Sequence, residues 1–189
     1  MDCKNRCFGN KKGQELYADY HDNEWGIPKY DDRELFELLI LEGAQAGLNW
    51  ETILKKLQGY QDAFYNFDTV KVASMTDSEL ESLRTNPDII RNKLKIYSAR
   101  KNARVFLYIQ KEFGSFSDYL WGFVNHQPIK NNWQSYKEIP VSIDISEKIS
   151  KDLRKKGMSF VGPTIIYAYM QAAGLVNDHL VDCWCYSRE

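Results

Sequence analysis

The chain has 189 residues, of which 43% are hydrophobic and 27% are charged, and its formal net charge is -1. This composition excludes disordered and fibrous proteins and allows one substantial hydrophobic core. No signal sequence is recognisable, and no apolar run approaches the roughly 20 residues that cross a bilayer, so we expect a cytoplasmic protein without a membrane partner. Because the net charge gives no global attraction to nucleic acid, any DNA binding must come from local basic patches.

Capping and proline signals predict several helices in the first two thirds of the chain. They would run from Asp31 or Asp32 to about Leu41, from Asn49 toward Phe64, from a capping box at Thr76 and Glu79, from Asn86-Pro87 to Phe113, and from Ser115 to about Val124. Residues 35–41 of the first helix are apolar almost without interruption. This run is too continuous for a surface helix and predicts deep burial.

A helix-hairpin-helix pattern is predicted at about residues 145–173. Asp144 and Glu147 can cap its first helix, which should end at Gly157. A short apolar turn then delivers Pro163 to the first turn of the second helix.

The predicted fold class is all-α. Only residues 139–143 could be extended, and nothing alternates long enough to build a sheet. No repeat, low-complexity tract or Pro/Gly-rich linker interrupts the sequence. We therefore expect a single compact domain over residues 1–189, with a monomer as the default state.

The turn of the hairpin is a candidate DNA-binding site. Gly162 lets the backbone approach a ligand closely, and Pro163 fixes the first helical residue. The free amides of Thr164 and Ile165 would then point outward at the positive end of the helix dipole, where a DNA phosphate fits. Basic residues gather on the two nearby predicted helices: Lys148, Lys151, Arg154, Lys155 and Lys156, and Arg91, Lys93, Lys95, Arg100, Lys101 and Arg104. The charges alone are typical of a solvated face. Together with the turn they favour DNA-backbone binding over a packed helix-turn-helix corner.

Soft metal ligands gather at the two ends of the chain. They are Cys3, Cys7 and His21 near the start, and His179, Cys183 and Cys185 near the finish. Such a mixture of thiolates and imidazoles suits tetrahedral zinc, which would join segments 1–30 and 175–189. The alternative is that they are buried thiols and hydrogen-bonded histidines, since no CxxC pair is present.

Two stretches combine a carboxylate with indole rings, at residues 20–26 and 41–50. A purine pocket needs flat apolar walls, which Tyr20, Trp25 and Trp50 could supply. Glu42 could read the base edge, and a carboxylate between an apolar helix and Gly-Ala residues is costly to bury without a partner. The indoles could equally belong to the core.

Four segments, in one order, closely resemble the bacterial 3-methyladenine DNA glycosylase I family. They are Tyr20-His21-Asp22-Asn23-Glu24-Trp25-Gly26, Leu41-Glu42-Gly43 through Trp50, Leu120-Trp121-Gly122-Phe123-Val124-Asn125-His126-Gln127-Pro128, and Gly174-Leu175-Val176-Asn177-Asp178-His179. The likeness runs from about Cys7 to Cys185. It implies a helix-hairpin-helix glycosylase that flips an alkylated base out of double-stranded DNA and releases free 3-methyladenine.

The resemblance also implies roles for individual residues. A structural zinc would be held by Cys7, His21, His179 and Cys183. Glu42, Tyr20 and Trp50 match the base-pocket residues of the family, and Trp25 matches the pocket wall. One departure is visible, because Phe8-Gly9 stands where some members carry a tryptophan after the first cysteine ligand. Phe8 could fill part of the same space.

The mechanism expected from these residues is monofunctional hydrolysis. No lysine opens the helix after the hairpin, where a bifunctional glycosylase would place its Schiff-base amine. Glu42 is expected to accept hydrogen bonds from the exocyclic amine side of the base, Tyr20 to assist at the edge, and Trp50 to stack on its face. Whether Glu42 also activates water is left open, with Asp178 as a weak alternative base.

Two other functions were weighed. A catalytic zinc hydrolase or deaminase could use Glu24 or Glu42 as proton shuttle, but there is no His-x-Glu with a Cys-x-x-Cys partner, and four ligands would close the coordination sphere. A non-enzymatic DNA-binding module would use only the hairpin and the basic helices, and would need no base pocket.

Overall fold

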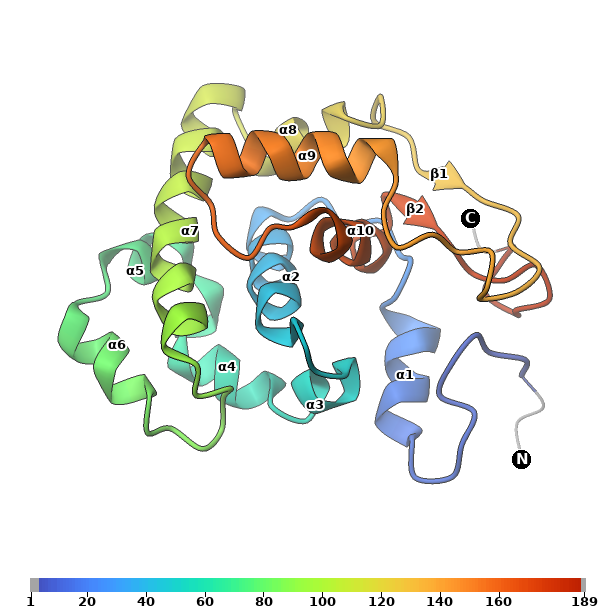
Figure 1. Ribbon diagram of the computed structural model, residues 1–189, viewed down its shortest axis with the longest axis horizontal. Helices are drawn as coiled ribbons and strands as arrows, with labels where there is room; N and C mark the ends of the chain where they lie inside the picture. The colour runs from blue at the N-terminus through green and yellow to red at the C-terminus, as the bar shows by residue number, and fades with distance from the viewer. Residues whose placement is uncertain (1–3, 188–189) are drawn as a thin grey trace.

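The computed structural model describes residues 4–187 and is almost entirely helical (Figure 1). Its helical elements are α1 (Glu15–Asn23), α2 (Asp32–Gln45), α3 (Trp50–Leu54), α4 (Leu57–Ala63), the 3-10 turn η1 (Tyr65–Phe67), α5 (Thr69–Ser74), α6 (Asp77–Leu83), α7 (Lys93–Phe113), α8 (Phe116–Gly122), α9 (Asp144–Lys155) and α10 (Pro163–Ala172). The predicted helical class is confirmed. The predicted domain over residues 1–189 stays a prediction. No helix within residues 4–187 is long and apolar enough to cross a membrane.

One short parallel strand pair was not predicted. β1 (Ile129–Lys130) pairs with β2 (Val176–Asn177), and each strand has only two residues. Residues 139–143, which could have been extended, form no strand. A ladder this short leaves no alternating pattern to detect, because strand signals need runs of about four residues or more.

Several helices begin where their capping residues predicted. The Asp31 side chain accepts from the backbone N–H of Glu34 at the start of α2. Thr76 and Glu79 form a reciprocal capping box before α6. Ser115 caps α8. In each case a side-chain oxygen satisfies one of the free N–H groups of the first turn, which is the physical basis of the signal.

Two predicted boundaries were wrong. The helix expected from Asn49 toward Phe64 is two short helices, α3 and α4. Pro87 does not begin a helix, because α7 starts only at Lys93, where the Asn92 side chain provides the cap.

Helix α9 begins at Asp144, but its cap differs from the prediction. The Ser146 hydroxyl bonds the backbone of Ile143, in place of a cap by Asp144 and Glu147.

Tertiary contacts explain the late start of α7. Residues 87–92 pass so close over α4 that a Cβ on Gly59 would lie 2.3 Å from the carbonyl oxygen of Asp88. The N–H of Ile90 donates to the Tyr60 hydroxyl, with N and O 3.2 Å apart. Residues 87–92 are therefore held against α4 as a turn and an irregular segment before α7 begins.

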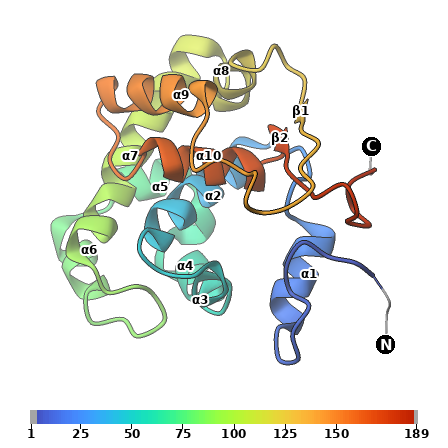
Figure 2. The same ribbon diagram turned by 45° about the vertical axis from the view of Figure 1, so that its right-hand side comes forward.

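Helix α2 lies at the centre of the fold. It packs against α3, α7, α8 and α10, while α9 packs on α10 and α5 on α7 (Figures 1 and 2). The apolar run at residues 35–41 is almost wholly buried, as predicted. Helix α1 stands apart from this core, with both chain ends on the same side of the molecule (Figure 2).

The segment after α1 is attached to the end of α10 by its backbone. Gly26 N–H donates to the Gln171 carbonyl and Lys29 N–H to the Ala173 carbonyl, each over 3.1 Å. Gly174 has a left-handed φ of +73°, and a Cβ there would lie 2.4 Å from the backbone nitrogen of Pro28. Only glycine fits this close crossing without moving the backbone.

Gly174→Ala is therefore expected to lower the free energy of unfolding by roughly 3 kcal/mol, from left-handed strain plus the clash with Pro28. Gly13 is a matched control, because its φ is +85° and a Cβ there would meet nothing within 4 Å. Gly13→Ala should cost only the strain, about 1 kcal/mol. Denaturant unfolding of both variants measures the difference, and equal losses would contradict the close crossing.

Candidate functional site

Four soft ligands from the two ends of the chain meet in one buried cluster: Cys7, His21, His179 and Cys183. Their ligand atoms all lie within 4.8 Å of one another. Cys183 Sγ is 3.4 Å from His21 Nε2 and 3.5 Å from His179 Nδ1, and Cys7 Sγ is 3.6 Å from the same His179 nitrogen. Two sulfurs and two imidazole nitrogens so arranged can hold a metal ion.

The other two candidate ligands are outside this group. Cys3 lies outside the described residues. Cys185 is buried beside the cluster, where its thiol faces the carbonyl oxygen of His21.

The imidazole rings of the cluster are oriented by a second set of contacts. His21 Nδ1 lies 2.9 Å from the Asp22 carboxylate, so its Nε2 faces the sulfurs. Asp22 also accepts two 2.8 Å hydrogen bonds from Arg6 and one of 3.0 Å from the Trp184 indole. Burial by itself would raise the pKa of Asp22, but the hydrogen bonds from Arg6, His21 and Trp184 hold that pKa well below its usual range. A carboxylate behind a ligating histidine is a common arrangement in metal sites.

A cavity of about 200 Å³ lies beside the cluster, between α1, α2, α3 and α10. It contains all four side chains predicted to form a base pocket: Tyr20, Trp25, Glu42 and Trp50. The rest of the lining is Phe8, Tyr17, Gln45, Ala168 and Gln171. Of these residues, the sequence pointed only to Phe8, which was expected to fill part of the space. Tyr17 could have been found from its place three residues before Tyr20 on one helix.

The cluster and the cavity share a wall. Phe8 directly follows Cys7, stacks on Tyr17 with ring centroids 4.4 Å apart, and meets Trp25 edge-on at 5.1 Å. Trp25 in turn packs against His179, with ring centroids 4.6 Å apart. The position of these two aromatic walls therefore depends on the chain ends meeting at the cluster.

Glu42 is the buried carboxyl group that lines the cavity. It is only 4% exposed and makes no hydrogen bond or ion pair with any residue between 4 and 187. Burial raises the pKa of Glu42 to about 8. Burial also raises the pKa of Tyr20 well above its usual value, and the nearby Glu42 adds to that increase. The cavity thus holds a buried carboxyl group that lacks a partner from the protein.

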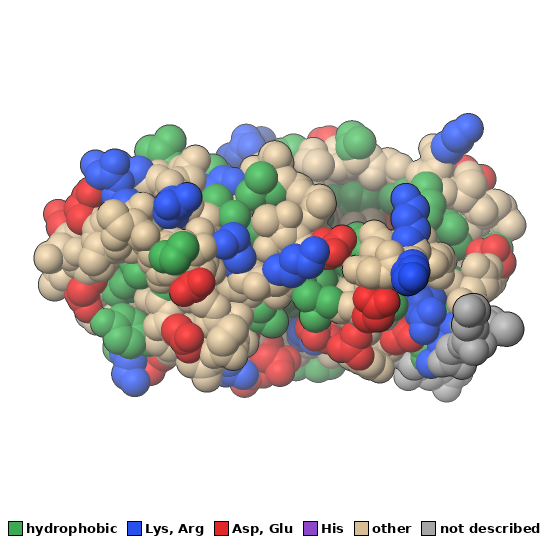
Figure 3. Space-filling view, turned by 90° about the horizontal axis from the view of Figure 1, so that it is seen from below, with side chains coloured by type: hydrophobic (Ala, Val, Ile, Leu, Met, Phe, Trp, Pro, Cys, Tyr) green, Lys and Arg blue, Asp and Glu red, His purple; other side chains and the backbone are tan. Residues whose placement is uncertain are grey.

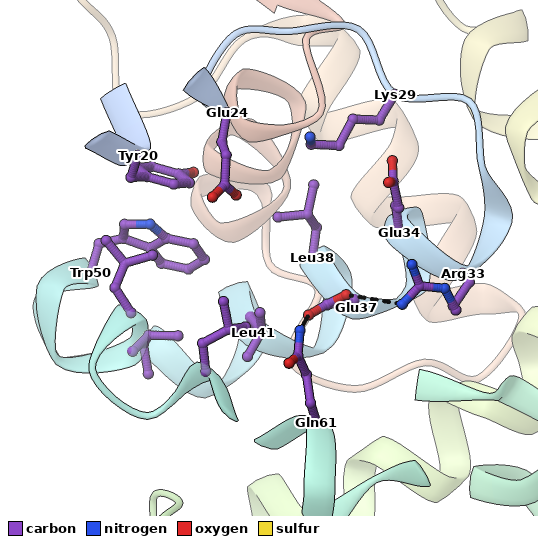
Figure 4. A pocket seen from close by; sticks show the side chains of 13 residues that line it. Tyr20, Glu24, Lys29, Arg33, Glu34, Glu37, Leu38, Leu41, Trp50 and Gln61 are labelled. Atoms are coloured by element: carbon purple, nitrogen blue, oxygen red, sulfur yellow. Dashed lines mark hydrogen bonds and ion pairs between the residues drawn. The ribbon is translucent and has the colours of Figure 1, made fainter. Parts of the chain in front are cut away.

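Trp50 is the second buried group without a partner. Its ring lies beside Tyr20, with centroids 5.5 Å apart and planes tilted by 46° (Figure 4). The indole N–H is close enough to influence the Tyr20 hydroxyl. The indole nitrogen makes no hydrogen bond of normal geometry. Among the described residues it is the one side-chain nitrogen or oxygen atom fully closed off from solvent that lacks a partner. Buried polar atoms left unpaired in this way are rare outside binding sites.

Lys95 holds the turn that connects Glu42 to Trp50. Its Nζ, which reaches over from α7, donates to the carbonyls of Ala44 at 2.8 Å and Ala46 at 2.7 Å. These carbonyls lie at the C-terminal end of α2, where a cation is favourable. Lys95 therefore positions the pocket and is not available to DNA, contrary to its place in the predicted basic cluster.

The hairpin turn lies between α9 and α10 and is held by Asn102 of α7. The Asn102 amide exchanges hydrogen bonds of 2.8 and 2.9 Å with the backbone of Ser159. Gly162 is the N-cap of α10 and Pro163 its first residue, as predicted. Thr164 is exposed, and neither its N–H nor that of Ile165 has a backbone partner among the described residues.

The basic residues near the hairpin divide into two groups. Those bound elsewhere in the protein include Lys101, Lys156, Arg100 and Arg104. Those whose side chains make neither an ion pair nor a hydrogen bond within residues 4–187 are Arg91, which precedes α7, and Lys148, Lys151, Arg154 and Lys155 on α9. The cationic face therefore belongs to α9 more than to α7.

Asp178, the weak alternative base, is fully occupied. It is 1% exposed and accepts hydrogen bonds of 2.5 to 2.8 Å from Asn131, Trp133, Tyr167 and Gln171. With four donors on two oxygens, it has no free lone pair for a water molecule. Its contact with Gln171 instead fixes one wall of the cavity.

The raised pKa of Glu42 predicts how stability depends on pH. The folded pKa of about 8 lies above the ordinary value of 4.5, so the folded state favours the protonated carboxyl. This stabilisation is complete below the ordinary pKa and is lost as the pH rises through about 8. From about pH 6 to pH 8 the free energy of unfolding should fall by roughly 2 kcal/mol through this group.

Glu42→Gln should remove that loss. The difference in unfolding free energy between the two proteins, measured at each pH, isolates Glu42 from other titrating groups. A difference that is flat between pH 6 and pH 8 would contradict the burial of an unpaired carboxyl.

Comparisons with known proteins agree over nearly the whole chain. A family model described as methyladenine glycosylase matches residues 10–186. The chain is 49% identical over 171 residues to DNA-3-methyladenine glycosylase 1 of Escherichia coli strain K12, covering 90% of this chain and 91% of the relative. It is 45% identical over 172 residues to DNA-3-methyladenine glycosylase of Haemophilus influenzae, covering 91% and 93%. A solved structure of 3-methyladenine DNA glycosylase I from Staphylococcus aureus, concerned with 3-methyladenine recognition, matches with a TM-score of 0.93 at 38% identity, covering 98% of each chain.

Proposed function

The chain belongs to the methyladenine glycosylase family, and we propose that it flips 3-methyladenine out of double-stranded DNA and hydrolyses its N-glycosidic bond. The single observation that carries this proposal is the cavity in which aromatic walls surround Glu42, a buried carboxyl without a protein partner. A flat base with a donor edge would stack on the walls and satisfy that group. A DNA-binding module without enzyme activity would have no need of such a cavity.

Glu42 selects the damaged base in this mechanism. An N3-methylated adenine nucleoside is cationic, and a cation beside the carboxyl lowers its pKa, so that the carboxylate forms when the base enters. Glu42 then accepts hydrogen bonds from the exocyclic amine side, Trp50 stacks on the ring, and Tyr20 lies at its edge. Because cleavage of the sugar bond neutralises the base, the leaving group needs little help from an acid. The carboxylate therefore contributes more to selection than to departure.

The hairpin holds the DNA backbone in this proposal. The first turn of α10, which begins at Pro163 after the Gly162 N-cap, offers the free amides of Thr164 and Ile165 to a phosphate. The unpaired cations of α9 extend this surface. No lysine stands at the start of α10 to form a Schiff base, which supports a monofunctional hydrolytic reaction.

We propose that the cluster of four ligands binds one structural zinc ion. With zinc–sulfur and zinc–nitrogen bonds of about 2.3 and 2.0 Å, tetrahedral angles place sulfur and nitrogen about 3.5 Å apart. Three of the four sulfur–nitrogen distances in the cluster are 3.4, 3.5 and 3.6 Å. Four protein ligands leave no position for a water molecule, which argues against a zinc hydrolase or deaminase. The ion would hold Phe8 and Trp25 in the pocket wall.

Cys183→Ser and Cys185→Ser form a matched pair that tests the ligand set. Both thiols are buried in the same turn, but only Cys183 belongs to the cluster of four. The purified Cys183→Ser protein should lose its zinc, measured by elemental analysis, and unfold at a lower temperature. Cys185→Ser should keep one zinc per chain. Zinc retained by Cys183→Ser and lost by Cys185→Ser would contradict the assignment, as would a chelated protein that keeps its fold and its melting temperature.

Glu42→Gln tests the proposed reaction. Glutamine keeps the shape of the side chain but cannot form the carboxylate, so release of 3-methyladenine from methylated DNA should fall by about 10- to 100-fold. Chromatography of the released bases in a single-turnover assay measures it. Glu15→Gln, on the exposed side of α1, is the control and should release the base at the rate of the unmodified protein. Equal rates for the unmodified protein and Glu42→Gln would refute the role of Glu42.

A further inference from the structure

A second cavity of about 230 Å³ lies beside the base pocket, between α1, α2, α3 and α4 (Figure 4). The two cavities share only Tyr20 and Trp50, so these rings form a partition between them. Seen from below, the surface is hollowed where α1 meets α3, and acidic and basic side chains are interspersed around it (Figure 3). Nothing in the proposed reaction uses this second cavity.

The inner part of the second cavity is apolar. Leu38 and Leu41 of α2, Ile53 and Leu54 of α3, and Leu57 of α4 form it together with the two rings of the partition. Such a surface binds the body of a flat hydrophobic molecule. The cavity is smaller than the roughly 300–1,000 Å³ typical of sites for drug-sized ligands, so its ligand would be small.

The outer part of the second cavity is charged, and three of its charged side chains lack partners among the described residues: Glu24, Lys29 and Glu34. Glu24 points into it from the end of α1, and Lys29 points into it from the opposite rim (Figure 4). Neither side chain has a hydrogen bond or ion pair with any described residue. Glu24 is half-buried, and burial raises its pKa, an effect that the charge of Lys29 opposes.

Neighbouring polar groups on the same rim are paired. Glu37 lies 3.6 Å from the Arg33 guanidinium and accepts a 2.9 Å hydrogen bond from the Gln61 amide. These contacts satisfy one side of the cavity and leave Glu24, Lys29 and Glu34 as its free charged groups, with the Glu24 carboxylate and the Lys29 ammonium on opposite sides of the space. A carboxylate faces a ligand donor, and an ammonium faces a ligand acceptor.

We propose that the second cavity binds a free purine base, stacked on the outer side of the Tyr20–Trp50 partition, with its donor edge at Glu24 and its acceptor edge at Lys29. A purine is small and flat and carries donors and acceptors on its edges, which is what this lining requires. The choice of a purine rests on the proposed function, because that reaction releases one in the adjoining pocket. A base bound here would touch both partition rings, so the product would inhibit excision by a mixed rather than a purely competitive pattern.

Methyl NMR separates the two cavities, because each has its own reporter methyl groups. Leu38 and Leu57 line only the second cavity, and Ala168 lines only the base pocket. Titration with adenine should shift the Leu38 and Leu57 methyl signals to saturation. In the double variant Glu24→Gln with Lys29→Met, this binding should weaken by at least about tenfold, while the Ala168 response stays unchanged. The control pair Lys12→Met with Glu15→Gln, both exposed, should behave like the unmodified protein.

Three outcomes would overturn the proposal. The leucine methyl signals could fail to saturate at millimolar adenine, or could respond equally in the double variant. Benzylamine, a cation without an acceptor edge, could bind as tightly as adenine, which would make the cavity a simple cation site. The base-release assay on the same protein is independent of these readings. Leucine shifts without release of 3-methyladenine would support the second site and refute the proposed function. Release of 3-methyladenine without leucine shifts would support the proposed function and refute the second site.

Discussion

The meeting of the two chain ends at the Cys7, His21, His179 and Cys183 cluster is the contact on which the rest of the site depends. Helix α1 lies outside the core built around α2. The segment that follows α1 is joined to the end of α10 by two backbone hydrogen bonds. Two walls of the base pocket, Phe8 and Trp25, adjoin the ligands directly in sequence or in space. A metal ion there would hold α1 against the core at a point where few apolar contacts do so. It would thereby fix the positions of Phe8 and Trp25 and the width of the pocket.

The cluster would stabilise the fold, whereas the interior of the pocket holds groups that destabilise it. The Glu42 carboxyl has no protein partner and lowers the stability of the folded protein at neutral pH. The folded protein must either take up a proton at Glu42 or bury a carboxylate without a counter-charge, and both cost free energy. The unsatisfied Trp50 indole adds to this cost. Such groups persist where a ligand completes them, and a cationic base would supply both charge and donors. In the reaction that we propose, an undamaged, neutral base would satisfy this arrangement less well, which would give selectivity for the damaged base.

Features that depend on residues close together in sequence were predicted better than features that depend on long-range contacts. Caps at Asp31, Thr76 and Ser115 marked helix starts correctly because the hydrogen bonds lie within three residues. Pro87 misled because the path of residues 87–92 is decided by α4, far away in sequence.

The same limit applies to the site. Glu42 and Trp50 stood out as unusual residues in their own segments. Gln171 lines the pocket, and Lys95 holds the turn beside it, only through the packing of α10 and α7. The second cavity was not predictable either, since Glu24 and Lys29 are ordinary surface charges until the fold turns both toward one space. In this protein, therefore, a functional residue can be recognised from its sequence neighbours when its side chain is costly to bury, as with Glu42. Residues that position others must be found from contacts between helices.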